Sequence, residues 1–173
     1  MDILAVHLNT KDKERTLHVK DSLKRFLAWL PAILIALAIF LFSHQPAEES
    51  TMTSESISQM LLSLANELKM IDLKDMNIKD IYFAMATPVR KSAHMIEFAA
   101  FDLSLIFALW FWEKRGKELV ETAFTIAFVY ACSDEFHQLF IPGRAGLVTD
   151  VLIDSVGLVI VSAGISYWLR KQK

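Results

Sequence analysis

The chain has 173 residues, of which 54% are hydrophobic and 22% are charged, and its mean hydropathy is +0.36. This length and composition fit one compact membrane domain and are too small for two ordinary domains. The net charge of −2, with no basic face or RNA-binding motif, gives no basis for nucleic-acid binding, and a single cysteine excludes an intrachain disulfide and a cysteine-based zinc site.

The first apolar segment follows a polar arm. Residues 1–25 mix acids and bases, and we expect them to form a short cytoplasmic arm. The next 17 residues, from Phe26 to Phe42, carry no charge. As a helix they span about 25 Å, which is enough for a thin bilayer. Because the segment lies far from the N-terminus and no small-residue cleavage site follows, it is not a typical signal peptide. We predict an uncleaved first transmembrane helix over residues 26–43.

Residues 44–91 are predicted to form an extracytoplasmic cap on the membrane surface. The first third is rich in Ser, Thr and Glu and is predicted to be a loop, with Ser54 or Ser56 as the candidate helix N-cap. Apolar residues at spacings of three and four predict an amphipathic helix over residues 57–68. A second short amphipathic helix is predicted over residues 78–86, ending before Pro88.

Three more apolar segments complete the predicted bundle, over about residues 92–112, 119–138 and 150–169. Aromatic residues typical of a membrane interface lie at the ends of these segments, at Trp110, Trp112, Tyr167 and Trp168. Basic residues in the arm, in the link after the second segment and in the tail place both termini and that link in the cytoplasm. We therefore predict an all-α, multi-pass protein of the cell membrane, with four transmembrane helices and an extracytoplasmic amphipathic helical segment between helices 1 and 2.

Acids and histidines interrupt the last three apolar segments. A charge at the centre of a spanning helix costs roughly 2.5–3.5 kcal/mol on insertion scales, so such residues usually face a bundle interior or a water-filled cavity. In the predicted topology most of them lie in the outer part of the membrane, where they include His94, Glu97, Asp134, Glu135, His137, Gln138, Asp150 and Asp154. Asp102 lies near the midplane. We expect it to make an interhelical hydrogen bond, with a proton path as the alternative.

The sequence leaves open whether this polar cluster is catalytic. His94 and His137 are candidates for general acid–base chemistry, with Glu97 or Glu135 to orient them. The same histidines and carboxylates have the ligand types of a divalent metal site, but no His-Glu-x-x-His element is present. No nucleophile elbow or phosphate-binding loop is present either. Enzymatic activity, metal and cofactor therefore stay undetermined at this stage.

A binding site and a structural network are the other interpretations. Lys91 and Arg144 are suited to hold a phosphate or pyrophosphate head group, since Arg offers bidentate donors. Further candidate binding residues are Asp134, Gln138, Asp150 and Asp154. In the structural alternative these residues only lock the helices together through buried ion pairs, such as Arg144 with Asp150.

Four motifs resemble the VanZ-like family of integral membrane proteins. They are F-S-H-Q-P, R-K-S-A-H-M-I-E-F, S-D-E-F-H-Q-L-F-I-P-G-R and D-V-L-I-D-S-V-G, and the resemblance covers residues 35 to 165. The resemblance implies that the family's characteristic positions are Lys91, His94, Glu97, Asp134, Glu135, Gln138, Arg144, Asp150 and Gly157. The chain departs from the family pattern at Asp154, where the family commonly has Asn, and at Val161, where it often has Gly.

This resemblance implies a role in the cell envelope, because the family takes its name from a protein associated with resistance to the glycopeptide teicoplanin. Residues 26–173 are then expected to form a single VanZ-like membrane domain. The leading hypothesis is an outward-facing polar site that binds or modifies an amphiphilic envelope molecule. Membrane lipids, a lipid-linked cell-wall intermediate and the glycopeptide are the partners this implies. The alternative is a non-enzymatic membrane scaffold or partner protein.

Overall fold

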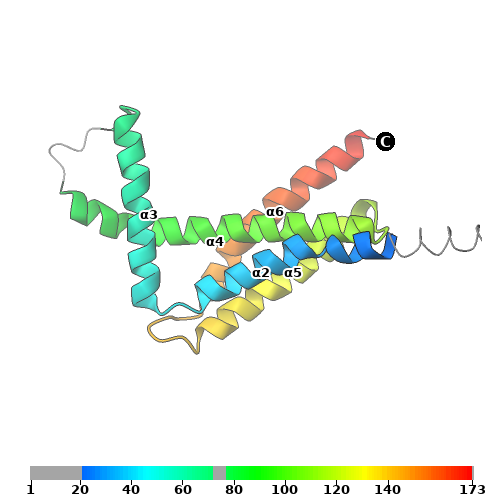
Figure 1. Ribbon diagram of the computed structural model, residues 1–173, viewed down its shortest axis with the longest axis horizontal. Coiled ribbons are helices and arrows are strands. Elements are labelled where there is room, and N and C mark those ends of the chain that lie inside the picture. The colour runs from blue at the N-terminus through cyan, green and yellow to red at the C-terminus, as the bar shows by residue number, and fades with distance from the viewer. Residues whose placement is uncertain (1–20, 72–76, 173) are drawn as a thin grey trace, which may run out of the picture.

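The computed structural model describes residues 21–71 and 77–172, and every regular element within those ranges is a helix. Most of the predicted cytoplasmic arm (residues 1–20) and a short part of the predicted cap (residues 72–76) lie outside the described residues. Helices α2, α4, α5 and α6 run along the length of the molecule, and α3 runs across α4 (Figure 1). The all-α prediction is therefore confirmed for the described part of the chain.

The first apolar segment is helical from Asp21 to Ser43, with a turn at residues 28–29 before α2 (Leu30–Ser43). It is long and apolar enough to cross a membrane, and it begins five residues before the predicted boundary. Pro31 lies in the first turn of α2, where its missing N–H leaves no helical hydrogen bond unmade. Leu30, Ile33, Leu34, Leu37 and Leu41 are exposed along one side of α2, while Ala32 and Ile39 on the other side are buried in the bundle core. An exposed apolar side is expected of a helix that faces lipid.

Helix α3 (Ala47–Glu67) begins much earlier than predicted. The predicted loop before residue 57 is wrong, and Ser54 and Ser56 are both interior residues of α3 rather than its N-cap. Two features favour a start at Ala47: Pro46 precedes it, and Glu48 and Glu49 place negative charge in the first turn, where the helix dipole favours it.

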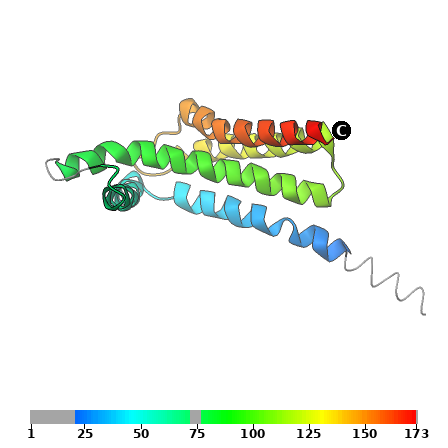
Figure 2. The same ribbon diagram turned by 90° about the horizontal axis from the view of Figure 1, so that it is seen from above.

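Five hydroxyl groups of α3, those of Thr51, Thr53, Ser54, Ser56 and Ser58, bond to carbonyls within the helix itself. Those of Thr51, Ser54 and Ser58 each donate to the carbonyl four residues earlier, at 2.8 Å. Ser50, Ser54 and Ser58 are also buried and recur every four residues, so they form one stripe of small side chains. This stripe lets α3 approach α4 closely where the two helices cross (Figure 2).

Helix α4 (Ile78–Phe111) is one continuous helix of 34 residues. The predicted short helix over 78–86 and the predicted span over 92–112 are therefore wrong as separate elements. Pro88 lies inside α4 and removes only one backbone hydrogen bond, because its ring replaces a single N–H. The remaining turns on both sides of Pro88 keep the helix continuous. The first turns of α4 consequently extend past α3 (Figure 1).

Helices α5 (Gly116–Gln138) and α6 (Val148–Lys171) are each slightly longer than predicted. Among the described residues, three helices are long and apolar enough to cross a membrane: Asp21–Ser43, Ile78–Phe111 and Val148–Lys171. Helix α5 differs from these because acidic residues occur near both of its ends. It nevertheless packs along α4 and α6, and its Ala123, Ala127 and Ala131 are completely buried.

Helices α4 and α6 touch at a glycine. A Cβ atom added to Gly157 would lie 2.2 Å from the carbonyl oxygen of Met95 and 3.2 Å from the Cβ of Ala99. Only glycine therefore permits this approach of the two backbones. Deeper in the same interface, the Ser162 hydroxyl donates to Asp102 Oδ2 at 3.0 Å, and Asp102 is completely buried. The expected interhelical hydrogen bond of Asp102 is confirmed.

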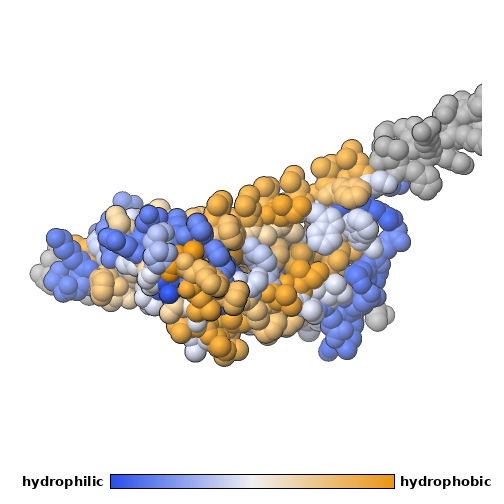
Figure 3. Space-filling view, turned by 90° about the horizontal axis from the view of Figure 1, so that it is seen from below, coloured by the Kyte–Doolittle hydropathy of each residue, from blue (hydrophilic) through white to orange (hydrophobic). Residues whose placement is uncertain are grey.

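The start of the first helix, the α4–α5 link and the C-terminus of α6 lie at one end of the bundle (Figures 1 and 2). Trp112 Nε1 donates to the Arg25 carbonyl at 3.2 Å, and Arg25 pairs with Glu113, so the first helix is held to this link. The exposed aromatic residues Trp110, Trp112, Tyr167 and Trp168 gather at the same end. Figure 3 shows a broad apolar band over the middle of the molecule, with polar surface toward both ends.

Candidate functional site

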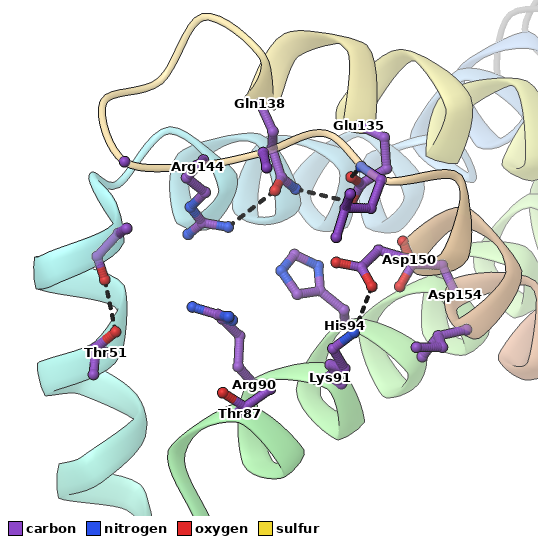
Figure 4. Close-up of a pocket in the computed structure, with 15 residues that line it drawn as sticks. Thr51, Thr87, Arg90, Lys91, His94, Glu135, Gln138, Arg144, Asp150 and Asp154 are labelled. Atoms are coloured by element: carbon purple, nitrogen blue, oxygen red, sulfur yellow. Dashed lines mark hydrogen bonds and ion pairs between the residues drawn. The ribbon is translucent and has the colours of Figure 1, made fainter. Parts of the chain in front are cut away.

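A polar cavity of about 470 Å³ lies at the opposite end of the bundle. Helix α4 forms one wall, the α5–α6 loop and the first turns of α6 form the other, and the start of α3 closes one side (Figure 4). The polar side chains that line it are Thr51, Thr87, Arg90, Lys91, His94, Glu135, Gln138, Arg144, Asp150 and Asp154. Residues from distant parts of the sequence therefore share one cavity.

The α5–α6 loop positions Arg144. Gly143 adopts φ +73°, which glycine accepts without strain, and the Arg144 N–H donates to the Ile141 carbonyl at 3.1 Å to close a turn. The Arg144 guanidinium donates to the carbonyls of Gln45 and Phe42, at 3.0 and 3.2 Å, and to Gln138 Oε1 at 3.3 Å. All three acceptors are neutral. Burial lowers the pKa of Arg144, and the nearby charge of Arg90 lowers it further, yet a guanidinium stays protonated in proteins.

Arg90 and Lys91 extend from α4 toward the same space (Figure 4). Lys91 Nζ is 2.6 Å from Asp150 Oδ1, and both side chains are about one third exposed or less, at 34% and 27%. Arg90 makes no hydrogen bond or ion pair with any residue of the described ranges. The two guanidinium groups at the cavity, Arg90 and Arg144, thus have no carboxylate partner there.

Carboxylates and amides near the end of α5 form a buried network. Gln138 Nε2 donates to Asp134 Oδ2 at 3.1 Å and to Glu135 Oε1 at 3.2 Å. The Ser43 hydroxyl donates to Asp134 Oδ2 at 2.7 Å, and the Leu147 N–H donates to Glu135 Oε2 at 3.0 Å. The network joins the end of α2, the end of α5 and the start of α6. Because its members satisfy one another, it holds this wall of the cavity in place.

Two polar groups at the cavity each have a buried atom without a hydrogen-bond partner in the described part of the chain. These atoms are His94 Nδ1 and Asp154 Oδ2. Glu97 Oε2 lies 3.8 Å from His94 Nδ1, which is too far for a hydrogen bond. Buried polar atoms are normally bonded, so an unpaired histidine nitrogen and carboxylate oxygen at a cavity indicate a place for a polar ligand or a water molecule.

A comparison of the sequence with known protein families identifies the family of this chain. Residues 28–170 match the family model VanZ/LLP1. The chain belongs to this family. No curated protein and no solved structure matches it. The VanZ/LLP1 match covers all four helices of the bundle and the crossing helix α3, so the cavity lies entirely within the part of the chain that the family shares.

The structure places seven of the ten sequence-predicted site residues on the cavity wall: Lys91, His94, Glu135, Gln138, Arg144, Asp150 and Asp154. Asp134 lies behind the wall, in the buried network. Glu97 lies on the other side of His94 and lines a smaller neighbouring cavity. His137 lies apart from both, where its ring stacks on Phe40 and its Nε2 is 3.3 Å from His44 Nδ1.

Several cavity residues escaped the sequence analysis. Arg90 is the main one, although its position one helical turn before His94 places both on the same face of α4, which is a usable signal. Asp150 pairs with Lys91, whereas sequence reasoning paired it with Arg144. In residues 21–71 and 77–172 no three His, Cys, Asp or Glu side chains are arranged to hold a metal ion.

Proposed function

We propose that this member of the VanZ/LLP1 family binds the anionic head group of an amphiphilic envelope molecule in the cavity. The observation that carries the proposal is the pair of guanidinium groups, Arg90 and Arg144, which face one cavity without a carboxylate partner in the described residues. Arginine donors match the oxygen atoms of phosphate and carboxylate groups, often in a bidentate arrangement.

Electrostatics supports an anion between these two groups. Arg90 and Arg144 repel each other, and burial weakens the solvent screening that would otherwise reduce the repulsion. An anion that accepts hydrogen bonds from both would remove this repulsion and replace lost hydration. The unpaired His94 Nδ1 and Lys91 lie on the same wall and supply further donors.

We propose an orientation in which the cavity opens on the extracytoplasmic side. Basic residues are abundant at the end of the bundle where the first helix starts and α6 ends. They include Lys24, Arg25, Lys114, Arg115, Lys117, Arg170 and Lys171, and loops of this composition stay in the cytoplasm. In this proposal α5 is the fourth spanning helix. Its Asp134 and Glu135 are buried against neighbouring helices, so lipid does not contact them. Helix α3 then lies outside as the cap.

The same cavity has groups suited to modify a bound head group. His94 is 14% exposed, its unpaired Nδ1 is available to take or give a proton, and the Glu97 carboxylate lies 3.8 Å from that nitrogen. A binding protein needs only the cations, whereas an enzyme needs His94 as well. The proposal includes a link to glycopeptide resistance through a lipid-linked cell-wall molecule or the antibiotic itself.

Single substitutions test this function. Arg144→Gln, His94→Gln and Glu135→Gln are expressed in a strain that depends on the protein for reduced glycopeptide susceptibility, and membrane abundance is measured in parallel. We expect Arg144→Gln to abolish the phenotype at normal abundance, because Gln keeps hydrogen-bonding capacity and removes the charge. Full activity of all three variants would refute the site. Loss of protein in all three would instead support the alternative, a scaffold whose polar residues form a structural network.

Binding itself is tested with the purified protein in detergent. Inorganic phosphate is the probe, and protection against thermal unfolding is the measurement. We expect phosphate to raise the melting temperature of the wild type and to have a much smaller effect on Arg144→Gln. His137→Gln is the matched control, since His137 lies outside the cavity.

A further inference from the structure

A second, smaller cavity of about 100 Å³ adjoins the polar one, between α3 and α4. Three residues, Arg90, His94 and Arg144, line both cavities. The remaining wall of the small cavity combines the apolar side chains of Phe42, Ile57, Val89 and Ala93 with the polar side chains of Gln45, Ser50, Thr53, Ser54 and Glu97. The guanidinium groups therefore stand between the polar cavity and a smaller one whose wall is partly apolar.

The small cavity leads to apolar surface. Phe42 is 46% exposed and Ile57 is 37% exposed, so the outer rim of the cavity is formed by side chains that also face the surroundings. Leu41 and Phe40, on α2 beside Phe42, are 57% and 42% exposed and continue the apolar surface along the bundle. In a spanning helix such a surface contacts lipid.

Helix α3 forms the outer edge of this passage. Its buried serine stripe holds it against α4, while Ile57 and, farther along, Leu61, Leu64 and Leu68 present an apolar row at spacings of four, three and four residues. These residues are partly or largely exposed in the described structure. A helix with one such face fits a position in the membrane interface, with the row toward the acyl chains.

We infer that the cavity between α3 and α4 is a lateral passage for the hydrocarbon chain of an amphiphile whose phosphate-type head group occupies the polar cavity. This inference rests on the proposed function and names its ligand class: an anionic lipid that enters from the bilayer, rather than a water-soluble anion. The head group lies between Arg90 and Arg144, and the chain leaves past Val89, Ala93 and Ile57 toward the lipid-facing surface of α2.

The volume of the small cavity determines how much a hydrocarbon chain is expected to strengthen binding. A cavity of about 100 Å³ shelters only the first few carbon atoms, and the rest of the chain stays in the bilayer. For a probe that reaches the site from water, each methylene group that the passage shelters strengthens binding roughly fourfold. Two or three sheltered methylene groups therefore correspond to roughly 15- to 60-fold tighter binding than the head group alone achieves.

The test blocks the passage from its exposed rim. Ile57→Trp and Thr53→Trp place a large side chain at two positions that line the small cavity and are exposed, so neither change disturbs the core. Met60→Trp is the matched control, since Met60 lies on the same helix, is 65% exposed and lines neither cavity. Dodecyl phosphate and inorganic phosphate are the two probes, titrated in one detergent, so that partitioning into micelles is the same for every variant.

We expect both blocking variants to bind dodecyl phosphate at least tenfold more weakly than the wild type and inorganic phosphate within twofold of it, with Met60→Trp unchanged for both. Blocked variants that bind dodecyl phosphate as well as the wild type would overturn the passage while leaving the head-group site intact. Equal loss of both probes would also overturn it. If the wild type binds neither probe, or if Arg144→Gln binds both normally, the proposed function fails first.

Discussion

Gly157 offers the sharpest test of the packing that shapes the cavity. In the variant Gly157→Ala the new Cβ would lie 2.2 Å from the Met95 carbonyl oxygen, whereas carbon and oxygen atoms in ordinary contact are about 3.3 Å apart. Helices α4 and α6 must therefore separate by about 1 Å, since the obstacle is backbone. Overpacking of this kind costs about 1–3 kcal/mol. Melting temperature falls about 2–4 °C per kcal/mol for a chain of this size, so we expect a loss of roughly 2–12 °C.

Gly164→Ala is the matched control on the same helix. No atom lies within 4 Å of a Cβ added to Gly164, so the substitution meets open space and gains about 0.5–1 kcal/mol from reduced backbone freedom. Thermal unfolding of both variants in one detergent is the assay. Asp154 lies one turn before Gly157, so phosphate protection should weaken in Gly157→Ala only. Equal melting temperatures for the two variants would refute the close approach of α4 and α6.

Three further predictions concern individual polar residues. His137→Phe should bind phosphate like the wild type, because the His137 ring stacks on Phe40 outside the cavity. His94→Phe should bind phosphate at least tenfold more weakly, because His94 lines the cavity. Equal phosphate affinities of the two variants in the titration would contradict these different roles of the two histidines. Asp102→Asn should raise the unfolding free energy by about 1 kcal/mol, since an amide of the same shape replaces a fully buried acid; a lower melting temperature would show that the acid is needed. Lys91→Gln should cost about 1–2 kcal/mol by leaving Asp150 without its cation, and adding Asp150→Asn should recover most of it in a double-mutant cycle measured by thermal unfolding.

The sequence predicted the helices of the bundle well, because long apolar segments have few alternatives to helix in a membrane. The predicted bounds of α3 and α4 were wrong, because hydrogen bonds within each helix decide where that helix begins and whether it continues. Serine and threonine around Ser54 favour loops when their hydroxyls compete with the backbone, but here each hydroxyl bonds to a carbonyl within the helix. Pro88 ends many helices, yet α4 continues through it because the turns on either side keep their own hydrogen bonds.

The grouping of the site residues followed from helix order and charge bias, which bring together the end of α5, the start of α6 and the part of α4 around His94. The ion pairs and hydrogen bonds within the site could not be predicted from the sequence, because they depend on how far each side chain extends from one helix toward another. Lys91 reaches Asp150, while Arg144 turns toward the backbone carbonyls of Phe42 and Gln45. Arg90 was missed because its place relative to Arg144 requires α3, α4 and the α5–α6 loop to be assembled.

The distribution of aromatic residues has a spectroscopic consequence. The four tryptophans, Trp29, Trp110, Trp112 and Trp168, lie just before α2, at the end of α4 and near the end of α6, so native tryptophan emission reports on that end of the bundle alone. The cavity end carries none of them. A tryptophan introduced at Ile57 therefore adds an emitter at the passage. Its emission in difference spectra against the parent should stay unchanged when dodecyl phosphate is added, because the side chain that emits is also the one that keeps the hydrocarbon chain out of the passage.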